Sequence, residues 1–581
     1  MSNKKFLIYS LAVVARASVI SQRQNTVTNA SSHCKVLPGD DAWPKVSDWN
    51  SLNRTVNGRL IASVPVASVC HDQPFNNYNA DTCTTLQNTW ADPTLLRINN
   101  PSEVLSMYFD NYTCDAFTPR SQACELGNRA SYVINVTGVA DVKAGIDFAR
   151  KRNVRLVIKN TGHDYLGKST GKGALSLWTH NLKSTKYIPN YKSSYYTGPA
   201  MKLGAGVEGF EAYAAANATG HRIVGGSCPT VGITGGYSQG GGHSLLSSLH
   251  GMGADNVLEW EVVTADGKHL VATPTQNSDL YWAMSGGGGG TYAVALSMTS
   301  RLHSDGIVGG SKLTFNDTKV GNDAFWEAIG SYHTLLAPFV DSGNTWLYTL
   351  TNNVFDSWVV TMPGADLNKV NALMKPFLDD LTKRGIDYDY TTSIAENYYN
   401  HFDHYLGPLP EGITPYAPFT GSRILPRAMF LDPAQNPTIT GSLRNASLAK
   451  AFDPLACLAL NVTGKAHSKN AVLPAWRDSI SVCLTPGVWD EHASPAEMAE
   501  RQDYAANVLQ PMLDAASPGG GVYLNEANYK QQNWQKEFYG TNYKQLLAIK
   551  NKYDPESLLY AHTAVGSEKW IEDENWRLCK A

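Results

Sequence analysis

The chain has 581 residues, of which 43% are hydrophobic and 17% charged, with a formal net charge of -3. This length predicts two or three domains, and the composition favours a packed globular protein. A charge near zero without a basic stripe argues against a nucleic-acid partner. Beyond the N-terminal segment, no stretch is typical of a membrane span.

The first residues resemble a processed targeting segment. Lys4 and Lys5 precede a short apolar run over Phe6–Ala15, and Ala15-Arg16-Ala17 is a small-x-small cleavage site. The segment therefore predicts a signal peptide over residues 1–17 and entry into the secretory pathway. The alternative is a short N-terminal helix of a cytosolic protein.

Eight Asn-x-Ser/Thr sequons support secretion, because this density is unusual in a cytosolic chain. We expect Asn135 to lie in a buried strand and to remain unmodified. The sequons begin at Asn29, Asn53, Asn111, Asn135, Asn217, Asn316, Asn445 and Asn461.

The cysteines number nine, so at least one lies outside any intramolecular disulfide. Connectivity does not follow from sequence, but local pairs such as Cys70 with Cys83 and Cys114 with Cys124 are favoured. Cys228 lies in a glycine-rich loop unlike the settings of the others, so it is the expected exception. The remaining four are Cys34, Cys457, Cys483 and Cys579.

In chain order, residues 18–125 are rich in Asn, Ser, Thr and Cys and predict a disulfide-containing N-terminal region. A second unit over 126–307 opens with a β-α-β pattern. Its strands are expected at Tyr132–Val136 and Val154–Ile158, and its helix at Val139–Arg152.

Residues 308–510 predict an α+β domain with less glycine. Strands are expected at Trp346–Leu350 and Trp358–Met362, and a helix at Asp366–Arg384. A last segment, 511–581, contains a strand-like Val522–Leu524 and a helix-like Asn542–Lys552.

Three glycine-rich segments indicate close approach of backbone to a ligand. Lys159–Gly167 follows a strand directly, so its main-chain N–H groups can form an anion-binding nest, although a tight turn is equally compatible. Gly225–His243 contains Cys228. Gly286–Gly290 lacks the Gly-Lys-Ser/Thr ending of a phosphate-binding loop.

Two patterns resemble known binding motifs but do not predict the corresponding sites. Gly204–Gly209 fits G-x-G-x-x-G, but no acidic residue follows at the distance that a nicotinamide dinucleotide site needs. His401 and His404 have metal-ligand spacing without a third clustered ligand, so no metal is predicted.

Five ordered motifs resemble the berberine-bridge-enzyme-like branch of the vanillyl-alcohol-oxidase flavoprotein superfamily, most closely its fungal isoamyl-alcohol-oxidase-like members. The resemblance runs from about residue 100 to the C-terminus. The motifs are TGHDYLG (161–167), GGSCPTVGITGGYSQGGGHS (225–244), GADNVLEWEVVTADG (253–267), DLYWAMSGGGGGTYAV (279–294) and FYGTNYKQLLAIKNKYDP (538–555).

The resemblance implies an α+β fold. A two-subdomain PCMH-type FAD-binding domain would occupy residues 126–307, and 308–510 would form a substrate domain with an antiparallel sheet. The segment 511–581 would return to the FAD-binding domain.

The resemblance also implies FAD linked to His163 at the flavin 8-methyl carbon and to Cys228 at ring carbon 6. The same family pattern places further cofactor contacts along the motifs. They are Asn160, Thr161, Gly162, Asp164, Gly167, Gly225, Gly226, Ser227, Val231, Gly232, Thr234, Gly235, Gly236, Asp255, Val257, Asn542 and Tyr543.

Family members often carry Y-x-N-Y on the strand facing the flavin, with the second Tyr as base. Here that sequence is Tyr523-Leu524-Asn525-Glu526, so Glu526 is the expected base with Tyr523 beside it. Strand alternation would put these two side chains on opposite faces unless a bulge intervenes. The alternative is that Glu526 pairs with a cation and only supports the fold.

The resemblance therefore implies an oxidase of an alcohol or of a specialised-metabolite intermediate. Val231 resembles the small residue of an open dioxygen gate, and hydrogen peroxide would be the by-product. The alternatives are an oligosaccharide oxidase, a flavin dehydrogenase that does not use dioxygen, and a secreted glycoprotein that binds a ligand without chemistry. Tyr398, Tyr399, His401 and Arg423 are possible substrate-cavity residues.

Overall fold

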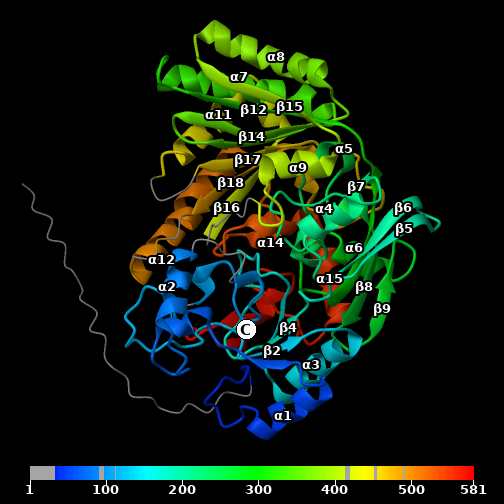
Figure 1. Ribbon diagram of the computed structural model, residues 1–581, viewed down its shortest axis with the longest axis vertical. Coiled ribbons are helices and arrows are strands. Elements are labelled where there is room, and N and C mark those ends of the chain that lie inside the picture. The colour runs from blue at the N-terminus through cyan, green and yellow to red at the C-terminus, as the bar shows by residue number, and fades with distance from the viewer. Residues whose placement is uncertain are drawn as a thin grey trace, which may run out of the picture.

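The computed structural model describes residues 33–90, 97–110, 113–412, 419–449, 454–487, 490 and 493–581. The predicted signal peptide and the sequons at Asn29 and Asn111 lie outside these residues. Three sheets of four or more strands organise the described residues, and Figure 1 shows the largest at the top and the other two below it. No helix in the described ranges is long and apolar enough to span a membrane.

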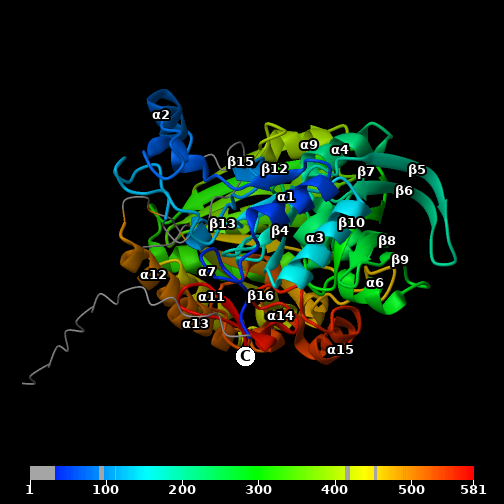
Figure 2. The same ribbon diagram turned by 90° about the horizontal axis from the view of Figure 1, so that it is seen from below.

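The smallest of the three sheets has the order β1-β2-β4-β3, in which β2, β4 and β3 are parallel and β1 is antiparallel. Helix α3 links β2 to β3, which confirms the predicted β-α-β unit. Figure 2 shows α1 near α3, which it contacts. The bounds are α1 Val46–Thr55, β1 Leu60–Ala62, β2 Tyr132–Asn135, α3 Val139–Arg152, β3 Leu156–Lys159 and β4 Leu175–Trp178.

Helix α3 forms because its apolar residues recur at helical spacing. Val142, Ile146 and Ala149 lie on one face and are fully buried. Asn153 ends the helix in the left-handed conformation, with φ of 52°. Asn135, in contrast, was expected to be buried but is partly exposed at the end of β2.

A five-stranded antiparallel sheet follows, in the order β5-β6-β10-β8-β9. The misleading Gly204–Gly209 pattern lies where β6 leads into α4, so it does not belong to a parallel nucleotide-binding unit. The bounds are β5 Thr185–Lys192, β6 Thr197–Gly204, α4 Gly209–Asn217, α5 Ser247–His250, β8 Val257–Thr264, β9 His269–Ala272, α6 Ser278–Met284 and β10 Ala293–Arg301, with β7 His221–Arg222 pairing with β11 His303–Ser304.

The largest sheet is antiparallel, in the order β15-β12-β14-β13-β17-β18-β16. Its bounds are β12 Val308–Asn316, β13 Thr345–Leu350, β14 Val354–Pro363, β15 Tyr388–Ala395, β16 Phe419–Pro426, β17 Leu455–Ala459 and β18 Ser479–Gly487. The strands predicted at Trp346–Leu350 and Trp358–Met362 are both present.

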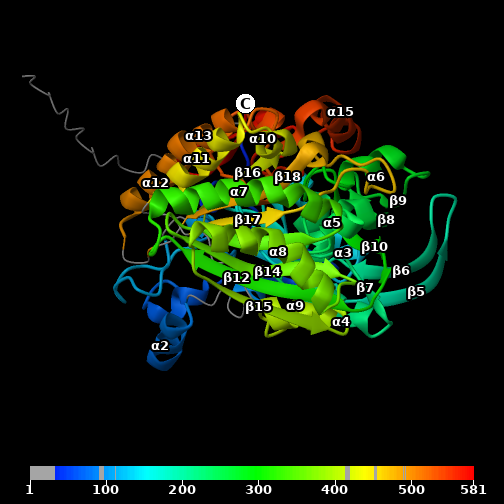
Figure 3. The same ribbon diagram turned by 90° about the horizontal axis from the view of Figure 1, so that it is seen from above.

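Helices α7 and α8 cover one face of this sheet (Figure 3). Tyr332 of α7 packs edge-on against Trp346 and Phe355, with ring centroids 4.9 and 5.1 Å away. The helices of this unit are α7 Asn322–Asp341, α8 Leu367–Arg384, α9 Tyr398–Leu406, α10 Arg427–Leu431, α11 Asn436–Ala446, α12 Pro495–Tyr504 and α13 Gln510–Ala516.

The last segment packs back onto the first two sheets. Leu559 forms a parallel bridge with Leu156, and Lys550 donates to the main-chain oxygen of Thr291. The predicted helix near Asn542 is present, but the predicted strand at Val522–Leu524 is wrong. The bounds are α14 Trp534–Tyr539, α15 Tyr543–Tyr553, β19 Trp570–Glu572 and β20 Leu578–Lys580.

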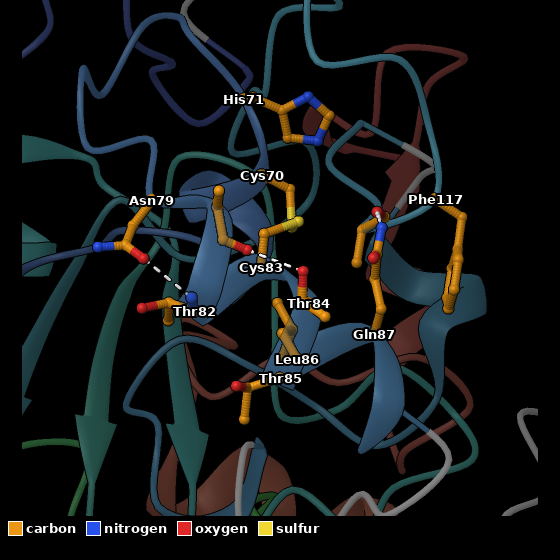
Figure 4. Close-up of a disulfide and its surroundings, with 12 residues drawn as sticks. Cys70, His71, Asn79, Thr82, Cys83, Thr84, Thr85, Leu86, Gln87 and Phe117 are labelled. Carbon is orange, nitrogen blue, oxygen red and sulfur yellow. Dashed lines mark hydrogen bonds between the residues drawn. A yellow bond between two sulfur atoms is a disulfide. The ribbon is translucent and has the colours of Figure 1, made fainter.

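Eight cysteines form four disulfides. The pairs Cys70–Cys83 and Cys114–Cys124 are confirmed, and the others are Cys34–Cys579 and Cys457–Cys483. Figure 4 shows Cys83 on α2 (Ala80–Asn88), where the side-chain oxygen of Asn79 accepts from the main-chain N–H of Thr82 and begins the helix. Cys228 is outside these disulfides, as expected.

Candidate active site

A cavity lies between the loop that follows β3, the glycine-rich segment with Cys228, and the C-terminal segment. It brings together residues more than 300 positions apart in the chain, such as Asn160 and Glu526. Fifteen predicted site residues line it. They are Asn160, Thr161, Gly162, His163, Asp164, Gly226, Ser227, Cys228, Val231, Gly232, Thr234, Gly235, Gly236, Tyr523 and Glu526.

Six predicted cofactor contacts do not line this cavity. They are Gly167, Gly225, Asp255, Val257, Asn542 and Tyr543. Two of them have charged partners that do not line the cavity. The carboxylate of Asp255 pairs with Arg477 at 2.7 Å, and the Tyr543 hydroxyl donates to Glu568 at 2.8 Å. The contact of all six residues with the cofactor stays a prediction.

The possible substrate-cavity residues do not line this cavity either, although the structure describes all four of them. They are Tyr398, Tyr399, His401 and Arg423. Tyr398 and His401 are buried in the packing of α9, and His401 Nε2 lies 2.9 Å from the Thr361 hydroxyl. Arg423 pairs with Glu537 at 2.8 Å. Within the described ranges, no three His, Cys, Asp or Glu side chains cluster as metal ligands.

His163 and Cys228 meet on one wall. His163 Nε2 lies 3.9 Å from Cys228 Sγ, although the two residues come from different glycine-rich segments. Burial lowers the pKa of His163 to about 3, and the nearby Lys159 ammonium contributes. The imidazole is therefore neutral at physiological pH and keeps one nitrogen lone pair.

Glycines in the Cys228 segment let Asn160 fit against the backbone. A Cβ atom at Gly232 or Gly235 would lie only 2.6 Å from Asn160 Nδ2. This nitrogen donates to the main-chain oxygen of Ala205 at 2.6 Å. The close approach explains why the segment carries glycine at these two positions.

Several buried polar atoms of the cavity residues have no protein partner. They are Asn160 Oδ1, Ser227 Oγ, Thr234 Oγ1, Gln239 Oε1 and His243 Nδ1. Buried polar atoms usually have a hydrogen-bond partner, so an arrangement of this kind fits a large polar ligand or ordered water. The Asp164 carboxylate, in contrast, accepts from the N–H groups of Leu166 and Ser169 and holds the loop itself.

Tyr523 and Glu526 share one face of the cavity because their segment is not a strand. A 3-10 helix, η8, spans Leu524–Glu526. Residues three apart are eclipsed in such a helix, whereas strand alternation would separate them. This turn, and not a bulge, therefore brings both side chains to the cavity.

His243 completes this end of the cavity. Its Nε2 lies 3.0 and 3.1 Å from the two carboxylate oxygens of Glu526. The Tyr523 hydroxyl accepts from the N–H of Gly242 and from Asn525 Nδ2. Burial, together with the Glu526 charge, nevertheless raises the pKa of Tyr523, so this phenol keeps its proton.

The sequence interpretation missed several lining residues. Tyr165 and Lys168 lie in or beside the TGHDYLG motif, and His243 ends the second glycine-rich segment. Their positions in these motifs could have identified them as cavity residues. Tyr560 lies outside the five motifs, so no sequence pattern identified it as a cavity residue. Burial lowers the pKa of Lys168 to about 8.

Two sequence families match the chain. The family described as "FAD binding domain" matches residues 130–273, and that described as "Berberine and berberine like" matches residues 522–566. These two regions supply most of the cavity wall, including the loop after β3 and the η8 turn.

Similar proteins extend the match to nearly the whole chain. The VAO-type flavoprotein oxidase VAO615 of Thermothelomyces thermophilus is 60% identical over 553 residues, covering 95% of this chain and 96% of that protein. The bifunctional decalin synthase of Penicillium decumbens is 48% identical over 579 residues, covering 99% of each.

Solved structures agree with this. The crystal structure of VAO-type flavoprotein MtVAO615 from Myceliophthora thermophila C1 matches with a TM-score of 0.93 and 60% identity, covering 94% of this chain and 100% of that chain. A glucooligosaccharide oxidase of Acremonium strictum, described with a 6-S-cysteinyl, 8α-N1-histidyl FAD, shares the fold at 18% identity and a TM-score of 0.60, covering 75% and 92%.

The chain belongs to the VAO-type, berberine-bridge-enzyme-like flavoprotein family. It is an FAD-dependent oxidoreductase. The predicted α+β fold, with a PCMH-type FAD-binding domain and an antiparallel sheet in the substrate domain, is confirmed.

Proposed function

We propose that the protein is an oxidase that takes hydride from an alcohol or a specialised-metabolite intermediate and passes the electrons to dioxygen. The observation that carries the proposal is the shared cavity of two attachment groups, His163 and Cys228, and one carboxylate, Glu526. The 60% identical relative is named an oxidase, which supports the use of dioxygen.

His163 and Cys228 would hold FAD through two covalent links. Bound there, FAD supplies the hydride acceptor. The neutral imidazole of His163 and the thiol of Cys228 are both nucleophiles of the kind that such links need. The glucooligosaccharide oxidase described above, which shares this fold, combines a cysteinyl and a histidyl link in its own FAD.

Glu526 is the proposed base. A carboxylate within the cavity can accept a hydroxyl proton from the substrate, and His243 Nε2–H holds that carboxylate through both oxygens. Tyr523 is a weaker candidate because its raised pKa keeps it protonated. Its hydroxyl would instead help to position groups at the same end of the cavity.

Val231 lines the cavity three residues after Cys228. A small side chain at this position leaves room for dioxygen to approach, and hydrogen peroxide would be the by-product. Four disulfides, together with the predicted signal peptide and sequons, support a secreted glycoprotein.

Acid precipitation tests the cofactor proposal. If the purified protein is yellow and the colour stays with the pellet, the flavin is covalently bound, and His163→Ala and Cys228→Ala then assign each link. A peroxide screen over alcohols, oligosaccharides and phenolic metabolites identifies the substrate class. Colour that moves into the supernatant rejects the two-link proposal, and substrate-dependent flavin reduction without peroxide indicates a dehydrogenase.

A further inference from the structure

Thr230 lies between the two groups proposed to bind the flavin. Its Oγ1 is 2.8 Å from His163 Nε2 and 3.4 Å from Cys228 Sγ. The residue is 2% exposed and does not itself line the cavity. It therefore contacts both nucleophiles from behind the wall without touching a ligand.

A threonine hydroxyl has one proton to donate and can also accept. If the hydroxyl accepts from His163 Nε2–H, its own proton is directed at the Cys228 sulfur. The three groups then form one chain from imidazole to hydroxyl to sulfur. In this arrangement the second imidazole nitrogen, Nδ1, carries the lone pair of the neutral ring.

We propose that Thr230 is a positioning residue for flavin attachment. It fixes the His163 tautomer in which Nδ1 is the nucleophile, and it donates to the Cys228 sulfur, which favours the thiolate. This inference rests on the proposed two-link attachment and adds one hydroxyl that prepares both reacting groups.

The chemistry balances for each link. A nitrogen–carbon bond forms at His163, or a sulfur–carbon bond at Cys228, and the flavin carbon loses one hydrogen. Each link therefore releases two protons and two electrons, counting the proton lost by the protein group. The flavin takes up the electrons, and dioxygen receives them to give one hydrogen peroxide per link.

Two substitutions separate the hydroxyl from the volume of the side chain. Thr230→Val keeps the shape and removes the hydroxyl, whereas Thr230→Ser keeps the hydroxyl. A matched control is Thr361→Val, because the Thr361 hydroxyl also bonds a buried histidine, His401, at 2.9 Å but lies outside the cavity.

The readouts are the flavin retained by acid-precipitated full-length protein and the masses of the proteolytic peptides containing His163 and Cys228. We expect Thr230→Val to lower the share of doubly linked protein about tenfold or more, the order expected for a lost hydrogen bond to a charged reacting group. The same variant should still contain FAD that acid releases. Thr230→Ser and Thr361→Val should retain both links.

The outcomes distinguish the two proposals. Doubly linked wild type with doubly linked Thr230→Val overturns the role of Thr230 and leaves the two-link attachment intact. Wild type without covalent flavin overturns both. An equal loss of links in Thr230→Val and Thr361→Val also overturns the role of Thr230, since it points to a general effect of losing a buried threonine hydroxyl.

Discussion

His163 and His401 have the same local chemistry in two regions of the molecule. In each, Nε2 lies within 2.9 Å of a threonine hydroxyl, and burial lowers the pKa to about 3. Their surroundings differ. His401 has no exposed surface and packs beside the Tyr405 ring at 4.9 Å, whereas His163 is partly exposed to the cavity and approaches Cys228.

A buried histidine with a lowered pKa is therefore not sufficient evidence of a functional site. What distinguishes His163 is a cavity with a second nucleophile beside it. The same contrast applies to two histidine–glutamate pairs. His243 and Glu526 meet at 3.0 Å on the cavity wall, and His269 and Glu261 meet at 2.9 Å on the five-stranded sheet, away from the cavity.

The largest expected effect is at the cavity pair. Glu526→Gln should slow substrate-dependent flavin reduction about 10²- to 10⁴-fold, the usual contribution of a general base, because an amide cannot take the proton. The loss of visible flavin absorbance under anaerobic conditions, with a substrate found in the peroxide screen, measures this rate.

Glu261→Gln is the matched control and should leave the reduction rate unchanged. Both variants should keep the covalent flavin. An unaffected rate in Glu526→Gln would show that the carboxylate only pairs with His243 and supports the fold.

Removing each of the two histidines should change a different property, the stability of the protein for His401 and the attachment of the flavin for His163. His401→Ala should destabilise the protein by about 2–4 kcal/mol, because it leaves a cavity and an unsatisfied Thr361 hydroxyl, while both flavin links persist. His163→Ala should remove the histidyl link and leave the flavin attached through Cys228 alone. Urea unfolding and peptide masses measure these two outcomes.

If His401→Ala also loses a link, or if His163→Ala retains two links, the distinction between the two regions is wrong. Denaturant midpoints should be compared at matched flavin content, since bound cofactor itself stabilises the folded state.

A smaller effect should appear in acid. Folded His401 has a pKa of about 3 and the unfolded residue about 6.5, so between these pH values only the unfolded chain binds the proton. Its contribution to stability is therefore lost as pH falls from 6.5 toward 3, by up to about 1.4 kcal/mol per pH unit.

His401→Gln should consequently show a smaller loss of unfolding free energy between pH 6.5 and 4.5 than the wild type. His404→Gln, on the exposed side of the same helix, is the control and should retain the wild-type loss. Equal pH dependence in wild type and His401→Gln would contradict the assignment of this acid sensitivity to His401.

Local sequence patterns correctly predicted much of the fold. The spacing of Val142, Ile146 and Ala149 defines α3 because helical periodicity is a property of neighbouring residues. Two of the disulfides close short loops, which made Cys70–Cys83 and Cys114–Cys124 natural pairs. The setting of Cys228 among glycines also separated it from the other eight cysteines.

Contacts between distant segments could not be read in this way. The η8 turn that aligns Tyr523 with Glu526 replaced a predicted strand, and His243 reaches Glu526 across 283 positions. Asp255, Asn542 and Tyr543 lie in motifs of the family, but their partners, Arg477, main-chain oxygens and Glu568, could not be predicted from those motifs.

The sequence by itself therefore supplied the candidate chemistry, His163, Cys228 and Glu526, through a resemblance to motifs of the family, because such motifs are runs of adjacent residues. Only the tertiary structure decided which of the candidates share a cavity and which partners, Thr230 and His243, hold them. The physical reason is that a side chain's neighbours are set by long-range packing and hydrogen bonding, which depend on the whole fold rather than on adjacent residues.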